Sequence, residues 1–117
     1  MTVDAAALPL SGTLDVDGFM DFLETRPEGE HWELIEGKAV MMAPASYAHL
    51  RIASNFCNLL NSAFAARRLD LYAYTDAGIR NPSLRNFQPE PDVVVVPGIS
   101  GYELYSEHYH LVAEVLS

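Results

Sequence analysis

The sequence is poor in cysteine and in basic residues, and it has no long hydrophobic run. Cys57 is its single cysteine, which excludes an intrachain disulfide and a cluster of thiolate metal ligands. No apolar run approaches the roughly 20 residues that cross a bilayer, so we expect no membrane partner. The first ten residues carry Asp4 and no basic segment, unlike a secretory signal. These absences together favour a cytoplasmic protein.

The scarcity of lysine and arginine bears on nucleic acid as a partner. The chain has seven basic and sixteen acidic residues, and its net charge is −9. DNA-binding proteins normally use basic side chains to displace counterions from phosphates, so this balance argues against DNA. The acidity is uneven, however, because residues 1–36 hold nine acidic residues and one basic residue, whereas 37–117 hold seven and six. The objection therefore applies mainly to the N-terminal third.

Apolar and polar residues alternate in a way that predicts one α/β domain with a mixed sheet. Residues 1–12 resemble a flexible leader, and 13–117 are long enough for a single domain. The spacing of apolar residues and the turn residues define its expected elements. These are a helix from about Leu14 to Pro27, strands over 31–35 and 39–43, a helix over 47–67, and strands over 69–75, 92–96 and 110–116.

Local signals fix the ends of several of these elements. Thr13 and Ser46 are the expected N-caps of the two helices, and Glu36-Gly37 is a hairpin signal. The unbroken valines of 93–96 favour a central strand covered on both faces. The long helix carries a broad apolar stripe. Its members are Ile52, Ala53, Phe56, Leu59, Leu60, Ala63 and Phe64.

Two acidic residues stand out because they occur within apolar strand-like segments. Asp92 precedes the valine run, and Glu114 interrupts the segment 111–116. A carboxylate is costly to bury unless it is paired or binds a metal. If the two strands are neighbours, the carboxylates converge and suit Mg²⁺, which can assist hydrolysis of a phosphodiester. The alternative is that Glu114 lies on a solvated sheet face and Asp92 caps a turn.

Three segments of the sequence stand out together: HWELIEG at 31–37, PDVVVV at 91–96 and LVAEVLS at 111–117. In this order they resemble motifs of the Uma2-type nucleases of the PD-(D/E)XK superfamily. The resemblance implies a restriction-endonuclease-like core and cleavage of DNA with Mg²⁺ or Mn²⁺. It also implies that Asp92 and Glu114 bind the metal, that Glu33 is an auxiliary acid, and that the protein is a homodimer.

One feature of that family is missing from the sequence. Relatives carry, beyond the position of Ser117, a lysine that helps to activate the attacking water, and the only lysine here is Lys38 beside the hairpin turn. We therefore expect a fold that is C-terminally incomplete, truncated after the Glu114 strand, and weak or absent catalysis. The alternatives are a non-catalytic homo-oligomeric interaction module and a fragment of a longer nuclease.

The remaining polar residues give weaker signals. Arg80 and Arg85 flank the loop before Asp92 and are the expected phosphate contacts. His108 and His110 could share a strand face, but no recognised histidine metal motif is present, so we expect surface or hydrogen-bonded histidines. His49, near the start of the long helix, borders the expected active-site groove or donates a hydrogen bond.

Overall fold

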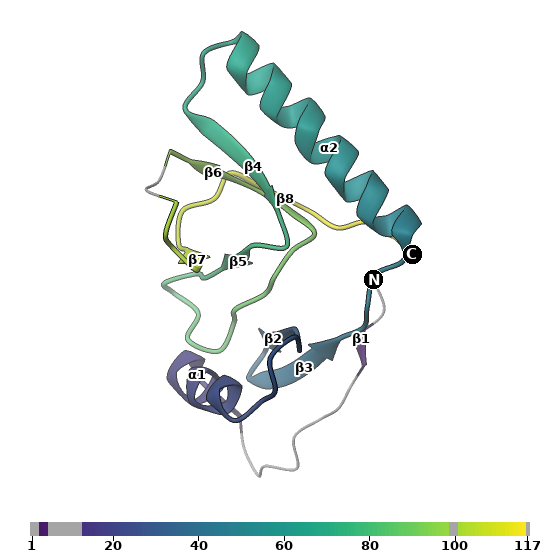
Figure 1. Cartoon of the computed structure of the whole chain (residues 1–117). Coiled ribbons are helices and arrows are strands. Elements are labelled where there is room, and N and C mark those ends of the chain that lie inside the picture. Colours follow the sequence, from purple (N-terminus) through teal and green to yellow (C-terminus); the bar gives the residue numbers. More distant parts are fainter. Residues whose placement is uncertain (1–2, 5–12, 99–100, 117) are drawn as a thin grey trace.

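The computed structural model describes residues 3–4, 13–98 and 101–116. As the sequence predicts, the chain has a mixed α+β architecture, in which α2 covers a central antiparallel sheet and α1 packs on a separate hairpin (Figure 1). The helices are α1 (Val16–Glu24) and α2 (Tyr47–Ala66). The strands are β1 (Val3–Asp4), β2 (Trp32–Ile35), β3 (Lys38–Met42), β4 (Leu71–Thr75), β5 (Gly78–Ile79), β6 (Val93–Pro97), β7 (Tyr105–Ser106) and β8 (Leu111–Ala113).

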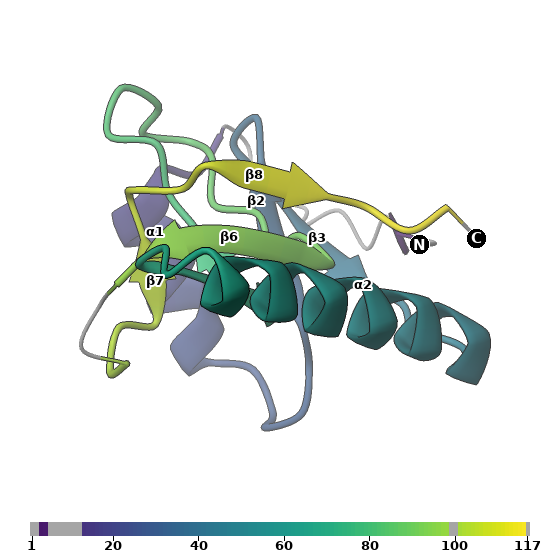
Figure 2. The same ribbon diagram turned by 90° about the horizontal axis from the view of Figure 1, so that it is seen from above.

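The central sheet has the strand order β4-β6-β8, and both of its strand pairs are antiparallel. Strand β6 is buried on both faces, which confirms the interpretation of its valine run. Seen from above, β8, β6 and α2 run side by side across the molecule (Figure 2). Alternate valines of β6 enter two clusters, Val93 and Val95 with Ala53 and Cys57 of α2, and Val94 and Val96 with Ile79 on the other face.

Helix α2 starts where the sequence predicts but buries only part of its apolar stripe. The Ser46 side chain accepts the backbone N–H of His49 at 3.1 Å and caps the helix. Apolar residues on the neighbouring part of the surface remain accessible. Their exposed fractions are 54% for Ile52, 38% for Phe56 and 70% for Leu59. The stripe is therefore wider than the face that contacts the sheet, whose fully buried residues are His49, Ala53 and Cys57.

The outer edge of β4 is covered at Ala73 by two side chains of α2, Asn61 and Cys57, and the Cys57 thiol donates to the Ala73 carbonyl oxygen at 3.1 Å. The Asn61 Nδ2 donates to the carbonyl oxygen of Ala73 at 3.0 Å, and Asn61 Oδ1 accepts the Ala73 backbone N–H at 2.8 Å. Because an edge strand leaves its outward N–H and C=O groups unpaired, this amide replaces a missing strand at Ala73. It also fixes α2 along the sheet.

The β2–β3 hairpin forms as predicted, whereas α1 begins slightly later than expected. Glu36 and Gly37 have φ angles of 49° and 81°, which a tight hairpin turn of this type needs. Asp15, not Thr13, is the N-cap of α1. The reason is that Thr13 packs closely against Gly37 and the Leu14 N–H donates to the Gly37 carbonyl at 2.7 Å, which keep this stretch extended.

The hairpin is joined to the segment that precedes β6. Leu34 and Gln88 exchange two backbone hydrogen bonds, with N···O distances of 3.1 and 2.8 Å. These bonds place β2 beside the residues that enter the central strand, and so bring Glu33 toward Asp92. Among the described residues, neither helix has the length and apolar character needed to cross a membrane.

Candidate active site

Asp92 is a buried carboxylate held at the start of the central strand. Only 1% of its surface is exposed. Its Oδ2 accepts the backbone N–H of Val115 at 2.7 Å, and its Oδ1 lies 3.0 Å from His49 Nε2. Burial of a carboxylate is costly unless the charge is compensated. The side chain is thus fixed in a position where a hydrogen-bond donor or a cation would compensate its charge.

Glu114 lies opposite Asp92 across the β6–β8 pair. Val93 pairs with Ala113 in an antiparallel register, so the next residues outward are Asp92 and Glu114. The Glu114 carboxyl is within hydrogen-bonding reach of Asp92, and partial burial together with the Asp92 and Glu33 charges raises its pKa to about 7. Glu114 remains solvent-accessible. The two carboxyl groups are therefore brought to the same side of the sheet, and the turn-cap alternative does not describe Asp92.

Glu33 joins Asp92 and Glu114 in a set of three carboxyls from three separate segments, the carboxyl cluster. It lies on β2 with 6% of its surface exposed. Its Oε2 accepts the backbone N–H of Glu90 at 2.8 Å, which ties the hairpin to the strand entrance. Burial and the charge of Asp92 raise the pKa of Glu33, although the Glu90 N–H partly opposes this. In both Glu33 and Glu114, burial and the charges of neighbouring carboxylates raise the pKa, as expected for acids that lie close together.

His49 is the site residue whose contact sequence reasoning did not identify. Its Nε2 is 3.0 Å from Asp92 Oδ1, yet the two are not aligned for a hydrogen bond, and Oδ1 is left buried without one. The useful signal was the Ser46 cap, which places His49 in the first turn of α2 on the same face as Ala53 and Cys57. That face packs on the sheet that carries Asp92.

A family model named Uma2, with the description "Putative restriction endonuclease", matches residues 19–117. The chain belongs to the Uma2 family. No curated protein and no solved structure matches it. The Uma2 match includes Glu33, Asp92 and Glu114, so the whole carboxyl cluster lies within the matched region. The family description implies a nuclease that acts on DNA, and restriction-endonuclease-like enzymes generally use divalent metal ions.

The carboxyl cluster is suited to the divalent metal ion that membership of the Uma2 family implies. Asp92 Oδ1 is buried without an aligned donor, and it belongs to a carboxylate that faces a second one on Glu114. Within the described ranges, no three histidine, cysteine or acidic side chains form a ready-made metal cage. Mg²⁺ does not need such a cage, because it is commonly bound by one or two carboxylates together with water and substrate phosphates.

A cavity of about 460 Å³ opens beside Asp92. It lies between the end of β3, the start of α2 and the segment that enters β6. Asp92 and His49 both line it, and so does Glu90. Burial raises the pKa of Glu90, as do the neighbouring Glu33 and Asp76 charges, while His31 opposes the shift. The cavity thus adjoins the carboxyl cluster at Asp92, and its lining includes further acidic residues.

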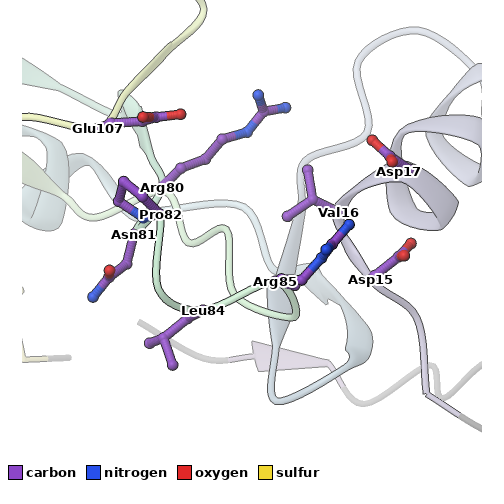
Figure 3. Close-up of a pocket in the computed structure, with 9 residues that line it drawn as sticks. All are labelled: Asp15, Val16, Asp17, Arg80, Asn81, Pro82, Leu84, Arg85 and Glu107. Carbon is purple, nitrogen blue, oxygen red and sulfur yellow. The ribbon is translucent and has the colours of Figure 1, made fainter.

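Arg80 and Arg85 lie in a different cleft from Asp92. This cleft, of about 180 Å³, is between the start of α1 and the 80–85 loop, and it shares no lining residue with the larger cavity (Figure 3). The Arg80 Nε donates to Gln88 Oε1 at 2.5 Å, and its guanidinium lies 4.4 Å from the centre of the Tyr105 ring. Arg80 therefore has structural partners already.

The other residues singled out from the sequence are not part of the carboxyl cluster. Lys38 is exposed at the start of β3, next to the hairpin turn. His108 and His110 are exposed and form no cluster. Cys57 is buried against the sheet, as a small core residue would be.

Proposed function

We propose that this Uma2 protein is a divalent-metal-dependent endonuclease that hydrolyses phosphodiester bonds in DNA. In this proposal Asp92 and Glu114 bind Mg²⁺ or Mn²⁺, and Glu33 is an auxiliary acid. The observation that carries it is that Asp92 and Glu114 lie opposite each other just beyond the β6–β8 pair, where Asp92 Oδ1 is buried and has no aligned donor. Family membership supplies the reaction class.

The protein groups around Asp92 serve to hold it in one orientation. The Val115 N–H fixes Oδ2, and the Glu90 N–H fixes the neighbouring Glu33 carboxylate. A ligand carboxylate that is already ordered loses little side-chain entropy when it binds a cation. A bound divalent cation would orient water and stabilise the charge that develops on the phosphodiester. Glu114, with its raised pKa, gives up its proton when it becomes a ligand.

The basic residues lie outside the carboxyl cluster. Lys38 is exposed at the start of β3, beside the hairpin turn. Arg80 and Arg85 are proposed to contact phosphates farther along the strand, because their cleft is separate from the cavity at Asp92. The site then depends on its metal for contact with the scissile phosphate.

A plasmid-nicking assay tests the proposal. Supercoiled DNA is incubated at length with Mg²⁺ or Mn²⁺ and with the wild type, Asp92→Asn, Glu114→Gln or Glu24→Gln. Glu24 is an exposed acid at the end of α1 that lines neither the cavity at Asp92 nor the cleft of Arg80, so its variant controls for the loss of one negative charge. We expect metal-dependent nicking by the wild type and by Glu24→Gln, and none by the two site variants. Equal nicking by Asp92→Asn, or no nicking by any protein, would contradict the proposal.

A second candidate, a homo-oligomeric interaction module, is favoured by the apolar surface of α2. Ile52, Phe56 and Leu59 are exposed on one side of the helix, and exposed apolar patches commonly mark contacts with another chain. We propose a homodimer through this surface, with or without nuclease activity. Light scattering should show a dimer that Leu59→Glu dissociates and that the matched control Asn58→Glu leaves intact. A monomeric wild type would contradict this candidate.

A further inference from the structure

The cavity beside Asp92 has partly apolar walls, unlike the carboxyl cluster at its edge. Met41 and Met42 from β3, Pro44 from the connection and Leu50 from α2 supply apolar surface. Its volume of about 460 Å³ is within the roughly 300–1,000 Å³ of small-molecule sites. Flexible methionine side chains adapt to planar ligands of differing outline. The cavity therefore suits a flat, partly apolar group of moderate size.

The charges around this cavity disfavour an anionic occupant that enters without a cation. Its lining includes acidic residues but neither lysine nor arginine. Asp76 and Glu90 belong to it, and each raises the cost of bringing a phosphate inside. A neutral group with N–H donors is favoured instead, because these carboxylates can accept its hydrogen bonds. The His31 Nδ1, 3.8 Å from Glu90 Oε2, adds a polar ring at the same rim.

A nucleobase has the required combination of a flat apolar face and a hydrogen-bonding edge. Carboxylate side chains accept hydrogen bonds from the exocyclic amino group of cytosine, which has two N–H donors, whereas unpaired thymine has no amino group and offers only its single N3–H. A base within a continuous duplex cannot enter a side cavity unless it leaves the stack. An unpaired strand presents its bases without that cost.

We propose that this cavity receives one unpaired nucleobase of a DNA strand whose neighbouring phosphate lies at Asp92. The inference rests on the proposed function, and it specifies the substrate as single-stranded or locally unpaired DNA. Contact through a base also provides binding energy that the few basic residues do not, because a chain with seven basic residues can release few counterions from a DNA backbone. The affinity should therefore vary with the identity of the base more than with the salt concentration.

Equilibrium binding separates this proposal from the question of catalysis. The probes are fluorescein-labelled oligodeoxycytidine and oligodeoxythymidine, measured by anisotropy with Ca²⁺, an oxygen-preferring cation, in place of Mg²⁺. Ala45→Trp places a large side chain at the rim of the cavity, where Ala45 is exposed. Ala48→Trp is the matched control, because Ala48 is exposed three residues farther along and does not line the cavity.

We expect oligodeoxycytidine to bind more tightly than oligodeoxythymidine and than the same sequence in a duplex. Ala45→Trp should weaken oligodeoxycytidine binding about tenfold, as expected for the loss of one stacked base, and Ala48→Trp should change it less than about twofold. Placing one abasic nucleotide in the strand should weaken binding by the wild type but not by Ala45→Trp. Equal effects of the two tryptophan variants, or tighter binding of duplex, would overturn the inference.

The outcome is distinguishable from failure of the proposed function. If the two tryptophan variants differ as expected but no variant cuts DNA, the base-binding cavity stands and the nuclease does not. If metal-dependent nicking requires Asp92 but the variants bind alike and duplex is preferred, the nuclease stands and the cavity has no base. Steep salt dependence with no preference between the oligonucleotides would assign binding to phosphates and would also overturn the inference.

Discussion

Replacing Glu114 with glutamine should stabilise the folded protein at alkaline pH. The carboxyl of Glu114 faces Asp92, and its pKa is raised from an ordinary 4.5 to about 7. The folded state therefore holds this proton more tightly than the unfolded state does, so stability falls as pH rises from about 4.5 to about 7. Glutamine cannot ionise but keeps a similar shape and a donor toward Asp92. The substitution removes the penalty at its source.

The magnitude follows from the pKa and from the exposure of the side chain. A rise from 4.5 to about 7 corresponds to roughly 3 kcal/mol of differential stability. Glu114 is more than a third exposed, so solvent screening reduces the effect to ~1–2 kcal/mol. We expect Glu114→Gln to exceed the wild type by this amount at pH 8 and to approach it at pH 4.5, where the folded-state carboxyl is neutral and only the unfolded one is partly ionised.

Urea unfolding without divalent metal, at the two pH values, measures the difference. Glu33 and Glu90 also have raised pKa values, so the wild type and the variant should share a residual decline in stability as pH rises. Glu107→Gln controls for the change in net charge and should not reproduce the gain. If Glu114→Gln is no more stable than the wild type at pH 8, the carboxyls of Glu114 and Asp92 do not repel each other in the folded protein, and the reasoning fails.

Three further expectations concern binding and packing. Mg²⁺ should raise the melting temperature of the wild type by mass action, and Asp92→Asn should abolish this rise in calorimetry. Asn61→Ala should cost ~1–3 kcal/mol in urea unfolding, because the Ala73 N–H loses its acceptor and the Ala73 carbonyl keeps only the weak thiol donor of Cys57. Gly78→Ala should cost ~1–3 kcal/mol, since the added Cβ would lie 2.4 Å from a ring carbon of Tyr105. An unchanged unfolding midpoint in either packing variant would contradict the corresponding contact.

Local patterns in the sequence located the central strand and the hairpin, but the strand predicted over 110–116 is only Leu111–Ala113, so Glu114 lies just beyond its end and Asp92 just before β6. The valine run predicted a buried central strand, and Glu36-Gly37 predicted the hairpin, because each depends on residues close together in the chain. Asp92 and Glu114 were detectable as acids inside apolar segments. Their partnership requires only that two predicted strands be neighbours, which the register of β6 and β8 provides.

Features that depend on packing between distant segments were not predictable in the same way. The Ser46 cap places His49 in the first turn of α2, but no local signal specifies that this turn packs beside Asp92 at the start of β6. The cap of α1 moved from Thr13 to Asp15 because the hairpin turn at Gly37 holds the preceding residues extended. The apolar stripe of α2 likewise could not reveal which of its sides the sheet would cover.

The most direct test of the account is a titration with Mn²⁺ followed by electron paramagnetic resonance, because it reports the metal site whether or not the chain cuts DNA. The wild type at pH 8 should bind one Mn²⁺ and release it to excess Mg²⁺. Asp92→Asn and Glu114→Gln should each lose this binding, while Glu107→Gln retains it. Binding that persists in both site variants, or no binding by the wild type, would contradict the assignment of Asp92 and Glu114 as metal ligands.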